Sequence, residues 1–175
     1  MDIQPTDLPT TRTFQRLAAA VSMTLGYVWR ISGINKLSTP GFVKGFGDYV
    51  KSSVEGGRSF EIYARIMNSV VAPRGDFFGY MVEFSEVSLG IALLSCGIWQ
   101  LFKDSRWASI ILCIANLGSF LMILNIILST GMKLPWIQPY NAYASGVSVE
   151  YVILFISIFL SVAYFQDFTA KYKKV

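Results

Sequence analysis

The sequence of 175 residues contains no histidine and only two cysteines. The lack of histidine removes the usual axial ligand of haem, the commonest ligand of protein-bound metals and the usual proton shuttle. Cys96 and Cys113 both lie inside apolar runs, which indicates buried thiols rather than half of a secreted disulfide framework. Any redox group must therefore be held in another way or supplied by another subunit, and a redox role for either thiol is left open.

Charged residues are also scarce, at 15%, whereas 53% of the chain is hydrophobic and 15% is aromatic. Four stretches are apolar over the roughly 20 residues that a membrane-crossing helix needs. The net charge of +4 does not indicate nucleic-acid binding, because the basic residues lie mainly between and beyond these stretches. We predict one membrane domain, residues 1–175, with spans at about 17–34, 77–102, 107–129 and 149–165.

The connection between the first two spans, residues 38–76, has helical periodicity of its own. Apolar residues recur at helical spacing from Pro40 to Val54 and, after the Gly56-Gly57 break, from Phe60 to Val71. Such segments are typical of amphipathic helices that lie on the membrane or cap a bundle. The predicted fold is therefore all-α, an integral membrane four-helix bundle with short amphipathic helices in the first connection.

The distribution of basic residues predicts the orientation of the bundle, because short cytoplasmic loops are enriched in lysine and arginine. The third connection carries only Lys133, and its aromatic residues Trp136 and Tyr140 suit the headgroup zone. We therefore expect a multi-pass protein of the plasma membrane with both termini in the cytoplasm. The first connection, about 40 residues long, argues the other way, but long loops count for less. The basic residues on the side of the two termini are Arg12, Arg16, Lys103, Arg106, Lys171, Lys173 and Lys174.

The polar residues within the spans gather towards one side of the membrane. In an antiparallel bundle, the end of spans one and three meets the start of spans two and four. Glu83, Glu86 and Gly90 share one helical face, and we expect Arg30 to pair with one of the two glutamates in a partly enclosed pocket. Two neighbouring carboxylates near a cation can hold different protonation states and pass protons. The residues at this side are Arg30, Lys36, Glu83, Glu86, Asn125 and Glu150.

Structural explanations compete with this one for most of these residues. Arg30 and Lys36 can extend to the headgroups, and Glu150 can stabilise the start of a helix. Asn116 and Asn125 can bond neighbouring helices. Glu83 and Glu86 are harder to explain in this way, because their stems are short and both lie more than a turn inside a span.

The sequence resembles the DoxX/DoxD-like family of small four-helix membrane proteins. The resemblance rests on Arg30-Ile-Ser-Gly33-Ile-Asn-Lys36-Leu37, which closes the first span, and on Glu86-Val-Ser-Leu89-Gly90 in the second. These motifs cover about residues 25–101, and the number and spacing of the spans extend the resemblance to the whole chain. The extended aromatic first connection is most similar to that of DoxD subunits of archaeal thiosulfate:quinone oxidoreductases.

The resemblance implies a respiratory enzyme of sulfur metabolism that oxidises two thiosulfates to tetrathionate and reduces a membrane quinone. It also implies a smaller DoxA-type partner and association with terminal quinol oxidase subunits. Thiosulfate is a dianion, and Arg30, Lys36, Asn125 and Glu150 are the substrate-binding candidates. Arg30, Glu83 and Glu86 are the catalytic candidates, with a glutamate as proton source. For the quinone, which accepts the electrons, the candidates are Glu86, Trp136 and Tyr140, and no metal site is predicted.

Two other functions use the same polar residues. A non-catalytic accessory subunit of a terminal quinol oxidase would need the pocket only for assembly or for admitting quinone. A small anion transporter would need a polar route through the rest of the bundle, where the sequence offers only Asn116.

Overall fold

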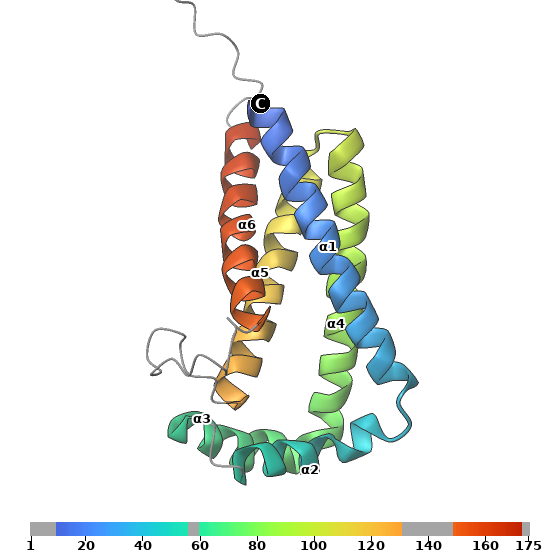
Figure 1. Cartoon of the computed structure of the whole chain (residues 1–175), viewed down its shortest axis with the longest axis vertical. Coiled ribbons are helices and arrows are strands. Elements are labelled where there is room, and N and C mark those ends of the chain that lie inside the picture. Colours follow the sequence, from blue (N-terminus) through green and yellow to red (C-terminus); the bar gives the residue numbers. More distant parts are fainter. Residues whose placement is uncertain (1–9, 56–59, 131–148, 173–175) are drawn as a thin grey trace, which may run out of the picture.

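The computed structural model describes residues 10–55, 60–130 and 149–172, and these are almost entirely helical. Four long helices run up and down to form a bundle, and short helices lie across one end of it (Figure 1). We call this end the capped end, and the opposite end, where the first long helix begins and the last one finishes, the termini end. The long helices are α1 (Thr10–Ser38), α4 (Gly75–Phe102), α5 (Arg106–Thr130) and α6 (Val149–Tyr172).

These four helices are each long and apolar enough to cross a membrane. Large apolar side chains such as Phe84, Ile91 and Phe159 are exposed on the outside of the bundle, which suits contact with lipid rather than water. The prediction of an all-α membrane bundle is therefore confirmed. Each predicted span lies within one of these helices, and α1 extends beyond the first predicted span at both ends.

The backbones of α1 and α4 pack directly against each other at glycines. A Cβ atom on Gly90 would lie 2.6 Å from the backbone nitrogen of Arg30, and one on Gly33 would lie 2.9 Å from the backbone nitrogen of Val87. Gly26 and Gly97 continue this contact along the same pair. In lipid, where no hydrophobic effect drives helices together, such close approach supplies the packing that holds them.

The first connection folds into a cap over the bundle. Gly41, at φ +80°, turns the chain from α1 into α2 (Phe42–Glu55), a backbone conformation that glycine adopts without strain. Helix α2 then packs on the start of α4, where a Cβ on Gly75 would lie only 2.5 Å from the nitrogen of Gly47. The inner face of α2 buries Val50, and this burial explains why the segment is amphipathic.

The chain returns from the cap to the bundle without a loop. Helix α3 (Glu61–Ile66) continues into a π-helical turn (Met67–Val71) and a 3₁₀ turn (Ala72–Arg74), and α4 follows at once. Met67, Val71 and Ala72 pack with Val50 of α2 in a small second core. The cap is thus built into the bundle at both of its ends.

Gly90→Ala tests the close contact of α1 and α4. We expect it to lower the free energy of unfolding by about 1–3 kcal/mol, the usual cost of overpacking. Thermal unfolding in detergent beside the native protein measures the loss. Gly45→Ala is the matched control, because a Cβ on Gly45 of α2 meets no atom within 4 Å. An equal effect of both substitutions contradicts the prediction.

Candidate functional site

A buried ion pair joins α1 to α4 at the capped end. The Lys36 Nζ atom donates to both carboxylate oxygens of Glu86, at 2.8 and 2.7 Å, and to the Ser32 hydroxyl at 2.9 Å. The Glu86 side chain is 2% exposed and the Lys36 side chain 26%. The carboxylate therefore lies inside the protein, and the ammonium group extends from it towards the surface.

The sequence places these two groups together through the glycine contact. Helix α1 approaches α4 so closely at Gly33 that a Cβ there would lie 3.2 Å from the Cβ of Glu86. Lys36 follows Gly33 by about one helical turn on the same face of α1. Its long side chain can then fold back along α1 past Ser32 and reach the carboxylate.

Glu83 lies one turn before Glu86 on the same buried face of α4 and is 4% exposed. Within the described residues, its side chain makes no hydrogen bond and no ion pair. Glu83 is therefore buried without an ion-pair partner in the described part of the chain, whereas Glu86 lies beside a cation. The two glutamates thus occupy opposite electrostatic environments on one helix face.

The cap covers this pair of carboxylates. The Lys36 Nζ atom lies 5.9 Å from the centroid of the Phe42 ring, at the start of α2. One turn before Glu83, a Cβ on Gly79 would lie 3.1 Å from the Cα of Val43. Helix α2 therefore crosses α4 close to the carboxylates and separates them from the bulk solvent at the capped end.

Arg30 does not take the place that we expected for it. The structure pairs Lys36, rather than Arg30, with a glutamate, and the Arg30 side chain is exposed. The physical reason is the glycine contact itself, since the backbone of Arg30 lies against Gly90 and leaves no room for the side chain between the helices. The guanidinium group must pass outwards, as in the alternative in which it extends to the headgroups.

The other candidates at this end are distributed around the cap. Asn125 of α5 is exposed and accepts a hydrogen bond from the Tyr63 hydroxyl of α3, a contact that sequence reasoning did not find. The helical spacing of Tyr63 in the first connection was the only available signal. Glu150 lies in the first turn of α6 and is half-buried. Trp136 and Tyr140 lie outside the described residues.

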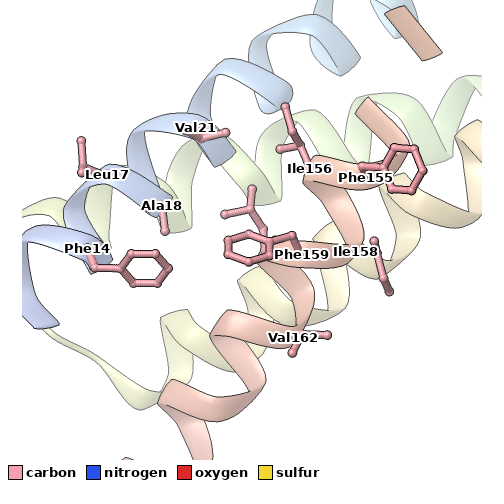
Figure 2. A pocket seen from close by; sticks show the side chains of 10 residues that line it. Phe14, Leu17, Ala18, Val21, Phe155, Ile156, Ile158, Phe159 and Val162 are labelled. Atoms are coloured by element: carbon pink, nitrogen blue, oxygen red, sulfur yellow. The ribbon is translucent and has the colours of Figure 1, made fainter. Parts of the chain in front are cut away.

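An apolar groove opens between α1 and α6, where the bundle is least tightly closed. Its volume is about 790 Å³, and only apolar side chains line it. Figure 2 shows Phe14 and Leu17 of α1 on one side and Phe155 and Phe159 of α6 on the other. The groove uses the N-terminal half of α1, whereas Lys36 and Glu86 lie near the other end of that helix.

This arrangement can exchange protons and hold a polar ring edge, but its charge does not favour an anion. Lys36 is neutralised by Glu86, and ionised Glu83 would leave the site with a net negative charge. Within the described part of the chain, no three acidic or thiol side chains lie together as metal ligands. Cys96 and Cys113 are both free thiols.

Comparisons of the chain with protein-family models, curated proteins and solved structures gave no match.

Lys36→Met tests whether the ion pair stabilises the site. We expect a loss on the order of 3 kcal/mol in the free energy of unfolding, because a buried carboxylate loses its counter-ion. The double variant Lys36→Met/Glu86→Leu should recover most of this loss. Thermal unfolding of the two variants in detergent measures the difference between them.

Lys51→Met is the control for this comparison. Its ion pair with Asp48 is exposed, at 55% and 87% for the two side chains, so removing it should cost less than about 1 kcal/mol. A double variant that is no more stable than Lys36→Met contradicts the prediction.

Proposed function

We propose that the protein is the membrane subunit of a thiosulfate:quinone oxidoreductase, in which Glu83 and Glu86 supply protons to a quinone as it is reduced. The observation that carries the proposal is the pair of buried carboxylates under the cap, one with a counter-ion and one without. Reduction of a quinone by two electrons consumes two protons. A buried carboxyl group close to the quinone is a suitable acid for this step.

The two glutamates would have different roles. Glu83, without an ion-pair partner among the described residues, is the better proton donor. Glu86, which is ion-paired with Lys36, would accept the next proton and pass it on. In this scheme Lys36 also offers its ammonium group to a quinone oxygen as negative charge develops there.

The quinone itself needs an apolar route from the lipid. The groove between α1 and α6 suits an isoprenoid tail, because it is open and lined only by apolar side chains. The ring would then be placed towards the capped end, where Trp136 and Tyr140 stay as predicted ring contacts.

Thiosulfate is the electron donor that the DoxX/DoxD-like resemblance implies, and two molecules would give tetrathionate and two electrons. Because Lys36 is already neutralised, the dianion is better bound by the exposed Arg30 at the capped end, and Asn125 and Glu150 stay predicted contacts. The smaller DoxA-type subunit would complete this outer site. The proposed location is the plasma membrane, with both termini in the cytoplasm and the capped end outside.

The Lys36–Glu86 pair also favours a second function. A buried pair with its hydrogen bonds made can serve assembly alone, and the chain would then be a non-catalytic accessory subunit of a terminal quinol oxidase. In that case removal of the chain lowers oxidase turnover, while thiosulfate has no effect on the quinone.

The protein reconstituted with its partner in quinone-containing liposomes should reduce quinone when thiosulfate is added. We expect Glu83→Gln to lower the rate about a hundredfold, a usual contribution of a general acid. Arg30→Gln should instead raise the thiosulfate concentration needed for half-maximal rate. The absorbance of the quinone measures both effects.

Glu61→Gln is the matched control, since Glu61 is exposed on α3 and pairs only with the exposed Arg65 among the described residues. Its rate should equal that of the native protein. If the native protein assembles with its partner but shows no thiosulfate-dependent quinone reduction, the oxidoreductase function is excluded and the accessory-subunit function is left.

A further inference from the structure

Four polar side chains of α1 recur at intervals of seven residues, and each makes a hydrogen bond into the bundle. Seven residues advance an α-helix by about 10 Å, so three intervals cover about 30 Å, the thickness of the hydrocarbon core. The series therefore runs across the whole membrane. Its members are Gln15, Ser22, Trp29 and Lys36.

The first step of this series is a charged network at the termini end. Asp167 of α6 accepts hydrogen bonds from Gln15, Ser109 and Lys171, each at 2.5 Å. Lys171 also pairs with Asp104, whose side chain is 54% exposed. The network thus joins α1, α5 and α6 to the turn that follows α4, and it reaches the surface through Asp104.

The second step lies in the middle of the bundle. The Ser22 hydroxyl donates to the Tyr164 hydroxyl at 3.4 Å, and Asn116 Nδ2 donates to Ser22 at 3.3 Å and to the Leu112 carbonyl at 2.8 Å. Ser22 and Asn116 are 0% exposed and Tyr164 is 2% exposed. A cluster of hydroxyl and amide groups therefore occupies the centre of the predicted hydrocarbon layer.

Asn116 Oδ1 is the feature that these contacts do not explain. It is buried and meets no hydrogen-bond donor among the residues that the structure describes. Turning the amide over would not help, because the oxygen would then face the Leu112 carbonyl, which is also an acceptor. A buried amide oxygen without a donor is rare, and an internal water is its usual partner.

The third step carries the series towards the glutamates. The Trp29 indole donates to Ser119 at 2.7 Å, and the hydroxyls of Ser119 and Ser157 lie 3.0 Å apart. Beside the second step, the Cys113 thiol lies 3.5 Å from the Ser161 hydroxyl. Groups able to both donate and accept therefore occur at each step from Asp167 to Ser119 and Ser157, and the Trp29 indole, a donor only, and Lys36 continue the series to Glu86.

We propose that this series is a hydrated proton path through the bundle, from the Asp104–Lys171–Asp167 network at the termini end to Glu86 at the capped end. A proton enters from water at the exposed Asp104. It passes from oxygen to oxygen along hydroxyls and internal water, each O–H bond that breaks being replaced by one that forms. It leaves by way of the Glu86 carboxylate, beside Lys36, which is 26% exposed.

Interhelical hydrogen bonds alone would hold the bundle together without such a path. They account for the contacts of Ser22, Trp29 and Ser119, but not for an acceptor at Asn116 that no donor in the described part of the chain meets. If the proposed quinone chemistry holds, the path supplies its protons from the termini side. The conduction itself does not depend on that chemistry.

The experiment measures proton flux with neither quinone nor thiosulfate present. Liposomes that contain the protein and a trapped pH-sensitive dye receive a potassium diffusion potential set by valinomycin. We expect the native protein to carry protons faster than protein-free liposomes do. Asn116→Leu, which keeps the approximate shape but removes the acceptor, should lose this excess flux.

Two further variants make the outcome decisive. Ser157→Ala, a small change at a buried position, should also lose the flux, which covers the case in which Asn116→Leu fails to fold. Asn68→Leu, at an exposed position of the cap, should conduct like the native protein. Native flux equal to that of protein-free liposomes overturns the path, as does full flux in folded Asn116→Leu and Ser157→Ala. Because no quinone is present, neither result depends on the oxidoreductase.

Discussion

The direct contact between the backbones of α1 and α4 is the constraint on which the rest of the structure depends. It exists because Gly26, Gly33, Gly90 and Gly97 present no side chain where the helices meet. The contact brings Lys36 within reach of Glu86 and turns Arg30 outwards. It also fixes the place where the chain leaves α1 for the cap, and so the position of α2 over the carboxylates. In lipid, packing of this kind replaces the hydrophobic effect that would hold a soluble bundle together.

Much of the fold can be predicted from the sequence alone, because long apolar runs identify membrane-spanning helices. The lengths of the apolar runs predict the four long helices, and the antiparallel order predicts that Glu83 and Glu86 lie at the same end as Lys36 and Asn125. The helical spacing in the first connection also predicts α2. The continuous path from α3 into α4 was less visible, since the π-helical turn follows from local hydrogen bonding rather than from any apolar period.

The choice of partners within the site was not predictable. Arg30 and Lys36 are both cations near the end of a span, and only the rotation of α1 against α4 decides which one meets a carboxylate. The serines of the interior were also overlooked, because a single serine within an apolar span scarcely changes its hydropathy. The inner half of the bundle was therefore expected to be apolar apart from Asn116, and the structure corrects this view. Ser22, Ser109, Ser119 and Ser157 are all fully buried there.

The seven-residue interval on α1 has a geometric consequence for the bundle. An α-helix has 3.6 residues per turn, so a series with this interval drifts around a straight helix by about 20° per step, or about 60° from Gln15 to Lys36. The partners change along the series, from α6 at Asp167, through α5 at Ser119, to α4 at Glu86. Helix α1 therefore bonds to three different neighbours in turn along its length. An insertion of one residue near its middle would rotate everything beyond it by about 100° and misalign all of the later contacts together.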